Sequence, residues 1–491
     1  MSAMAYDKQS FLAGVAVGRN MRSMPIREHT EAPNVFRFTL WIDQTQTSRN
    51  FTCVINLTGK ISWGDGQETE LTASGTGIWY THTYLTDGVF HVTIIGDLYA
   101  LGFTSGASYT QNPTLITVDT PYPPLPASLS RPRYFSIGGL FSGCVNLLYV
   151  PQNFLQNIAN DDVYIDSLDS MFSMCQHMSY LPDGFFSKVK FRGSGVSAAN
   201  LFYSCSALRA LPSDLFDNEQ RIKITSTYRM CKGCTSLRTL PDGLFDNIYG
   251  VTTAEGMFSG CTSLTALPRG LLDNFDECTN FAELCSECES LQTIPNGLFA
   301  NSPNVTTFCR VFYVCYALHD LPSGLFAGKS RVTTFEGAFA GCWALTSVSE
   351  DTFYGCSSVT SIRLIFNAAG ILTIPSGIFA SMVNLTDAYM AFYTAWRLTA
   401  LPSGLFANNT LVTEFGNLCA WCTALTTIGS GVFDNLSSEY VGFWYAFEGC
   451  SAITSAVPEL WLTFTTGNPG RGCYTGCTAA ANYNDIPTTW R

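Results

Sequence analysis

The amino-acid sequence predicts a mainly β protein with short helical turns, in which a small β-sandwich precedes a long solenoid of stacked repeats. The stronger of two observations behind this prediction is a cysteine that returns every 27 residues, at Cys234, Cys261, Cys288, Cys315 and Cys342. Such a period is typical of arrays in which each unit buries its apolar face against its neighbours. The other observation is a series of short N-terminal segments rich in β-branched and aromatic residues.

The composition narrows the class of protein and of partner. Only 13% of the 491 residues are charged and 46% are hydrophobic, which argues against a disordered chain. The net charge of -12 disfavours a nucleic-acid partner, because such a partner requires a basic face. No apolar run reaches the roughly 18 residues of a membrane span, so we expect no membrane insertion. The short apolar run at 11–17 follows Asp7 and Lys8 and has no cleavage site after it, so we expect no secretory signal.

Residues 1–32 are predicted to be an extended leader that anchors the chain. Residues 33–103 then carry segments with the composition of strands, and one of these is followed by the turn sequence WGDG at 63–66. Asp-Gly tolerates the positive φ that tight turns require. Several short strands joined by turns predict a small β-sandwich. The expected strands are 36–42, 51–57, 59–63 and 90–96.

The segment 33–103 resembles the polycystic-kidney-disease-type immunoglobulin-like domain. The matching residues are ISWGDG at 61–66, YTHTY at 80–84 and GVFHVT at 88–93. The resemblance implies that Trp63 packs in the core and that Asp65 holds the turn by hydrogen bonds.

Residues 104–133 form a proline-rich connector in the predicted domain order. Proline at this density breaks regular structure and stiffens a linker, which could also cap the first repeat. The prolines are Pro113, Pro121, Pro123, Pro124, Pro126 and Pro132.

About thirteen repeats are predicted in residues 134–491. A buried, reduced cysteine packs as a small hydrophobe, so we expect a ladder of free thiols and no disulfides along it. In two units alanine is expected in place of the cysteine, at Ala368 and Ala395. The shared position is held by Cys144, Cys175, Cys205, Cys234, Cys261, Cys288, Cys315, Cys342, Cys422, Cys450 and Cys477.

Spacing within the unit predicts its inward face. Apolar residues three apart can point to one interior in a tight coil, and the segment 264–267 is short enough for one strand per repeat. Pro-x-Gly after it is a turn signal. The apolar positions of one unit are Phe258, Cys261, Leu264 and Leu267.

The ends of the array depart from the consensus. The early repeats are longer, and we expect their extra residues at 156–167, 187–197 and 217–226 to form loops on one face. The last units, at 456–461 and 484–487, are degenerate, as expected of a terminal cap.

The repeats resemble the leucine-rich-repeat family, in particular the BspA-like surface-protein type and its relative in mycoplasma lipoproteins. The residues that carry the resemblance are MFSGCTSLTALP at 257–268, VFYVCYALHDLP at 311–322, and LPSGLF at 321–326 and 401–406. The combination of a WGDG domain with these repeats is similar to gut-bacterial and phage proteins. The resemblance implies a recognition surface spread over many units.

Three Cys-x-x-Cys pairs raise the alternative of a zinc site. We expect a structural role, because the first cysteine of each pair stands where other units have phenylalanine. Cys278 lies close in sequence to the middle pair, so that cluster is the strongest candidate for a metal site. Asp161 and Asp162 could bind calcium, and the alternative is that they form a solvated loop. The pairs are Cys231/Cys234, Cys285/Cys288 and Cys419/Cys422. No HExxH or GxSxG motif is present, so we expect no enzyme, no cofactor and no metal.

Aromatic residues that vary between units are the predicted ligand-binding surface. Tyrosine and tryptophan bury large areas at recognition sites with few rotors to restrict. The alternative is that these side chains fill gaps between coils. The residues are Tyr203, Tyr313, Tyr316, Trp343, Tyr393, Trp396, Trp421 and Trp444.

The predicted function is that of a phage or prophage virion protein, at a tail tip or fibre. Its repeats would bind a bacterial surface glycan or protein, and its N-terminus would bind other virion proteins. The alternatives are a structural or decoration protein of the virion and a BspA-like adhesin on the bacterial cell surface. A homo-oligomer is compatible with each of these.

Overall fold

The computed structural model describes residues 34–42, 50–71, 78–103, 114–124, 133–158, 163–438, 440–467 and 469–491. The predicted leader and the Asp161–Asp162 pair lie outside these ranges. Within them the chain is mainly β with almost no helix. The helical elements are α2 (Leu460–Thr463) and two 3-10 turns, η1 (Glu350–Phe353) and η2 (Tyr483–Asp485). No helix in this described part has the length and apolar character needed to cross a membrane.

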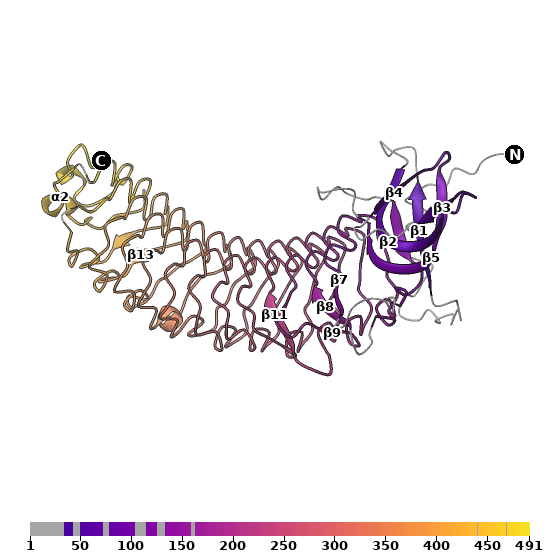
Figure 1. Ribbon diagram of the computed structural model, residues 1–491. Helices are drawn as coiled ribbons and strands as arrows, with labels where there is room; N and C mark the ends of the chain where they lie inside the picture. The colour runs from indigo at the N-terminus through magenta and orange to yellow at the C-terminus, as the bar shows by residue number, and fades with distance from the viewer. Residues whose placement is uncertain are drawn as a thin grey trace.

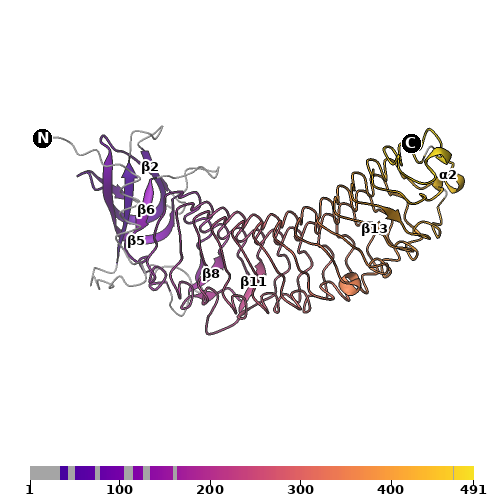
Figure 2. The same cartoon turned by 180° about the vertical axis from the view of Figure 1, so that it is seen from behind.

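A sheet at the N-terminal end is followed by a curved stack of coils that runs to the C-terminus (Figure 1). The view from behind shows the same curvature, with the orange turn of η1 on the convex edge (Figure 2). The sheet has the order β3-β2-β5-β1-β6, and β4 also pairs with β2. Its strands are β1 (Val35–Ile42), β2 (Asn50–Ser62), β3 (Glu68–Leu71), β4 (Ile78–Thr83), β5 (Gly88–Gly102) and β6 (Leu115–Val118).

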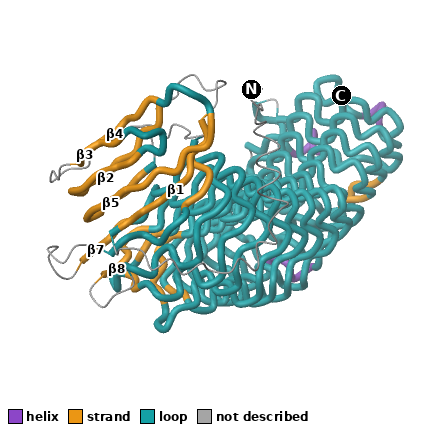
Figure 3. Tube along the Cα trace, turned by 90° about the vertical axis from the view of Figure 1, so that its right-hand side faces the viewer, coloured by secondary structure: helices purple, strands orange, loops and turns teal. Residues whose placement is uncertain are grey.

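The six strands are hydrogen-bonded as one sheet, in which the two long strands β2 and β5 pair along both of their halves. A register shift between Ile55 and Leu57 separates the halves. One half of β2 pairs with β3 and the other with β4. The strands lie side by side in Figure 3.

The core of the sheet forms around the residues that carry the WGDG and HTY motifs. Trp63 is buried, which confirms its expected place in the core. Asp65 accepts a hydrogen bond from the Gln67 backbone N–H (3.0 Å), which confirms its expected role in the turn. The same carboxylate lies 2.7 Å from Nε2 of His82, and the His82 ring stacks on the Trp63 indole at 4.7 Å. The two motifs are therefore one packing unit.

Strand β6 lies inside the range predicted to be a proline-rich connector, and it belongs to the sheet. It pairs with β1 and also forms a parallel bridge from Thr117 to Tyr149 of the first coil. The Tyr122 backbone N–H donates to the carbonyl of Phe154 (2.8 Å). The sheet and the first coil consequently share one continuous hydrophobic core.

Each coil turns its apolar residues inward, as the spacing of three predicts: Phe258, Cys261, Leu264 and Leu267 are all buried. Around the phenylalanine and the cysteine, every second backbone N–H donates to the next coil, and the N–H groups between them donate within their own coil. The N–H of Phe258 donates to Leu284 of the next coil (2.9 Å), whereas the N–H of Cys261 donates three residues back, to Phe258 (3.1 Å). Neighbouring coils are thus joined by hydrogen bonds from every second residue, without forming a regular strand.

The strand predicted at 264–267 is reduced to a single parallel bridge, Ala266 to Thr293. Among the described residues, β13 (Ala400–Leu401) and β14 (Thr427–Ile428) are the two-residue strands at this position. A second column of single-residue parallel bridges, which the sequence analysis did not predict, lies a few residues before the consensus phenylalanine position of successive coils. It joins Thr253, Asn280, Thr307, Thr334, Ser361, Asp387, Glu414 and Gly442.

The expectation that the early insertions form loops was wrong for part of each insertion. Residues 163–167, 190–191, 196–197 and 222–226 extend the second column of bridges into parallel strands, because apolar residues alternate along them and pair with the adjacent coil. The strands form two parallel sheets, in the orders β7-β8-β9 and β10-β11-β12. They are β7 (Arg133–Ser136), β8 (Val163–Ser167), β9 (Lys190–Phe191), β10 (Val196–Ser197), β11 (Ile222–Ser226) and β12 (Ile248–Tyr249).

The placement of alanine at the cysteine position needs one correction. Ala369, not Ala368, is equivalent to Cys342, because it is buried and its N–H donates to Phe366 three residues back (3.0 Å). Ala368 has a φ of 52° and is equivalent to Gly341, which has a φ of 75°. Ala395 is buried at the predicted position.

Candidate ligand-binding surface

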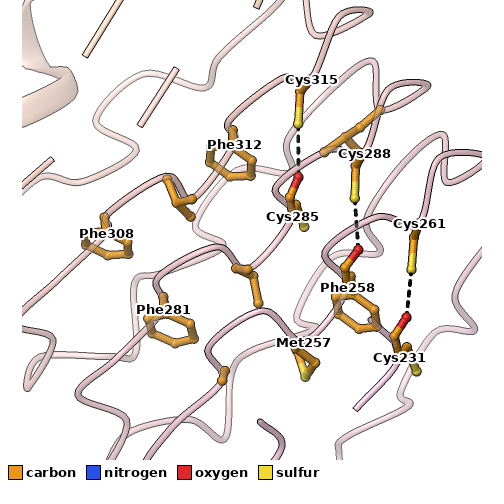
Figure 4. Packing of buried hydrophobic residues seen from close by; sticks show 14 of the residues in the cluster. Cys231, Met257, Phe258, Cys261, Phe281, Cys285, Cys288, Phe308, Phe312 and Cys315 are labelled. Carbon is orange, nitrogen blue, oxygen red and sulfur yellow. Dashed lines mark hydrogen bonds between the residues drawn. The ribbon is translucent and has the colours of Figure 1, made fainter. Parts of the chain in front are cut away.

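The cysteine ladder lies in the interior of the coils. In Figure 4 the sulfur atoms of Cys261, Cys288 and Cys315 each point to a backbone carbonyl of the preceding coil. Cys288 donates to Phe258 (3.2 Å) and Cys315 to Cys285 (3.1 Å). All cysteines with described side chains are free, as expected of a reduced ladder. The thiols therefore join coils as weak donors inside an apolar core.

Burial makes these thiols weak nucleophiles. It raises the pKa of Cys342 to about 12 and that of Cys278 to about 12, so the reactive thiolate is scarce at neutral pH. Cys285 stands at the phenylalanine position of its coil and is buried beside Cys288. Among the described residues, no group of three or more His, Cys, Asp or Glu side chains could hold a metal ion.

One segment of each coil, which we call the turn strip, contains the ladder cysteine and the residues around it. It runs from three residues before the first phenylalanine to two residues after the cysteine, for example 255–263. Its side chains range from buried, as for Met257 and Ser259, to about half exposed, as for Trp343. The turn η1 on the convex edge of the stack is half a repeat away along the chain (Figure 1). All eight predicted aromatic residues belong to the turn strip.

Four tryptophans of the turn strip are about half exposed. Their exposed fractions are 52% for Trp343, 50% for Trp396, 49% for Trp421 and 48% for Trp444. The four predicted tyrosines are more covered, with intermediate burial: Tyr203, Tyr313, Tyr316 and Tyr393. The tryptophans thus present the larger aromatic surface to a ligand.

Neighbouring coils bring some of these rings together. The rings of Tyr316 and Trp343 lie 4.3 Å apart, centroid to centroid. Tyr203 lies apart from the others, since the coils of Cys234, Cys261 and Cys288 separate it from Tyr313.

Trp421 lies against Gly449, the residue at the same position of the next coil. A Cβ atom at Gly449 would lie only 2.7 Å from Cε3 of the indole. Trp421 and Gly449 both adopt positive φ, 64° and 72°. The glycine therefore lets the indole rest on the backbone of the next coil and keep an exposed surface.

Arginine and further aromatic residues complete the turn strip, and the sequence analysis missed them. Guanidinium groups lie over aromatic rings in the attractive geometry of a cation–π pair. The sequence signal for them was the variable residue type at the position three residues before the consensus phenylalanine. That position differs between units, as do other positions of the strip. The pairs on the strip are Arg229–Tyr228 (4.7 Å), Arg310–Tyr313 (5.7 Å), Arg363–Tyr389 (4.4 Å) and Arg397–Trp396 (5.5 Å).

Comparisons with known proteins add little. No family model matches the chain, and no curated protein matches it significantly. A leucine-rich cell surface protein from Faecalibacterium prausnitzii is similar at 18% identity over 52% of this chain and 83% of that one, with a TM-score of 0.19. The TLR13–ssRNA13 complex is similar at 11% identity over 70% of each chain, with a TM-score of 0.13. Such weak superpositions carry no weight for fold or function, which rest on the chain's own residues.

Proposed function

We propose that this chain is a recognition protein that binds a bacterial surface through the turn strip. The observation that carries the proposal is the exposure of four tryptophans on the strip. Tryptophan is highly buried on average, and exposed aromatic groups mark interaction sites. Aromatic and arginine side chains are also the residues that most often dominate binding energy.

The finer fold assignment belongs to the same proposal. We take the coils to be a leucine-rich-repeat solenoid of the BspA-like type, and the sheet to be a polycystic-kidney-disease-type immunoglobulin-like domain. The recurring phenylalanine–cysteine–leucine phrase and its burial support the first assignment. The packing of Trp63, Asp65 and His82 supports the second.

We place the protein on a phage or prophage particle, at a tail tip or fibre, with the N-terminus contacting other virion proteins. The pairing of a WGDG domain with these repeats supports this location. The alternative location is the bacterial cell surface, as a BspA-like adhesin.

The test is binding of the labelled full-length chain to a panel of bacterial strains that includes the host. We expect strain-selective binding that weakens about tenfold or more in the variant Trp421→Ala/Trp444→Ala, because hot-spot truncations cost more than about 1 kcal/mol. The matched control is Tyr354→Ala, which removes an aromatic ring that is 70% exposed directly after η1. Absence of binding to every strain would refute recognition. The full chain is needed because β6 and Tyr122 cap the first coil.

A structural or decoration role in the virion is the second candidate function. Exposed apolar side chains on consecutive coils favour it: Tyr354 (70%), Val383 (49%) and Leu411 (44%). Such a patch fits burial against another subunit or another copy of the chain. Incorporation into particles without binding to any cell would support this role.

A further inference from the structure

We infer that the ligand of the turn strip is a glycan and that it lies along a track formed by Trp396, Trp421 and Trp444. This inference rests on the proposed function and names its ligand class. The three tryptophans belong to three consecutive coils, which contain Phe392, Cys419 and Phe447 at equivalent positions. Each coil therefore contributes one indole to the track.

The track runs diagonally across the strip. Trp396 follows the position of the ladder cysteine, Trp421 precedes it, and Trp444 lies three residues before the first phenylalanine. The coils are in direct contact here, since the Trp421 N–H donates to Glu448 (2.6 Å) and the Asn417 N–H donates to Trp444 (2.8 Å).

The position of the Trp421 indole suits stacking against a sugar ring. Gly449 supports the indole from one side, and about half of the side chain stays exposed. The face of an aromatic ring carries partial negative charge. It attracts the partly positive C–H groups on the apolar face of a pyranose, so a supported indole is a stacking platform for a sugar.

Polar groups beside the indoles suit the hydroxyl groups of a glycan. The Arg397 guanidinium lies 5.5 Å from the Trp396 ring centroid, and Asn417 and Glu448 are half-buried on the same strip. Thr423 and Ser451, which follow the ladder cysteines of their coils, are exposed. Protein hot spots instead cluster in fully desolvated, well-packed pockets. Small and polar residues around half-exposed indoles therefore favour a glycan over a protein partner.

The test uses cells of a strain that the full-length chain binds. One sample is treated with periodate, which cleaves vicinal diols of sugars, and another with proteinase K. We expect periodate to abolish binding and proteinase K to leave it intact. Loss of binding after proteinase K, with none after periodate, would overturn the glycan and leave recognition standing. No binding to untreated cells would remove both proposals.

The track itself is tested with polysaccharide released from the same cells, titrated against tryptophan fluorescence. Trp421→Ala and Trp444→Ala should each weaken binding about tenfold or more, as expected of stacking residues. Tyr354→Ala is the control, because Tyr354 is 70% exposed and lies outside the turn strip, directly after η1. An equal loss in Tyr354→Ala, or no loss in either track variant, would overturn the track. Thermal unfolding of each variant checks that the fold is kept.

Discussion

At the scale of single residues, the ladder position holds a small apolar side chain, which in coils with a cysteine also donates a hydrogen bond. The carbonyl of Phe258 accepts both the N–H of Cys261 (3.1 Å) and the Sγ–H of Cys288 (3.2 Å). Valine would fill the space but would not donate. Alanine at Ala369 and Ala395 shows that the donor is dispensable in single coils.

Cys288→Ala should lower the free energy of unfolding by about 1–2 kcal/mol, because it removes a buried sulfur and one hydrogen bond. The measurement is chemical denaturation followed by circular dichroism. Glu289→Ala is the control, since this exposed neighbour should change stability by less than about 0.5 kcal/mol. Equal midpoints for Cys288→Ala and the native chain would contradict the packing role of the ladder.

At the scale of elements, the turn after β2 is held by charge as well as by packing. Burial acts to raise the pKa of Asp65, but the hydrogen bonds from His82 and the Gln67 N–H outweigh it and lower the pKa. A carboxylate with a lowered pKa in the folded state stabilises the fold above its ordinary pKa of 3.8, and this stability is lost as the pH falls through the folded pKa.

Asp65→Asn should therefore lower the melting temperature at pH 7, and the difference from the native chain should shrink as the pH falls below 3.8. Differential scanning calorimetry at several pH values measures this. Glu68→Gln serves as the control, because the exposed Glu68–Lys60 pair (3.0 Å) should contribute little. A difference that stays constant with pH would show that the Asp65 charge is not the stabilising feature.

At the scale of the whole molecule, the sheet acts as the N-terminal cap of the stack. The Phe103 ring lies 5.1 Å from Phe38 of the sheet and 5.7 Å from Phe141 of the first coil. At the other end, the Tyr474 N–H donates to Trp490 (2.7 Å), so the terminal residues satisfy donors of the last coil. Both ends of the stack are covered, as the stability of repeat arrays requires.

Phe103→Ala should cost about 3–5 kcal/mol, as for other buried phenylalanines. Because the core is shared, amide hydrogen exchange should accelerate both in β1 and in residues 137–147 of the first coil. Leu85→Ala, at a side chain that is 78% exposed, is the control. Faster exchange confined to the sheet would show that the two parts are stabilised independently.

Local patterns were sufficient for the features that depend on short spacings. The interval of three between Phe258, Cys261 and Leu264 predicted their burial, and the family resemblance carried by the WGDG motif implied the burial of Trp63. The 27-residue period predicted which residues recur at equivalent positions. It did not decide between Ala368 and Ala369, because that coil lacks the cysteine that sets the phase.

The sequence by itself thus determined the repeat, its inward face and the aromatic residues that vary around it, because these follow from periodicity along the chain. Tertiary structure alone decided the column of bridges through Thr253 and the strands within the early insertions, since pairing depends on what the adjacent coil presents. It also decided that Trp421 rests on Gly449 while Tyr316 packs on Trp343. Contacts between residues a full repeat apart depend on how the coils are stacked, which a linear pattern does not specify.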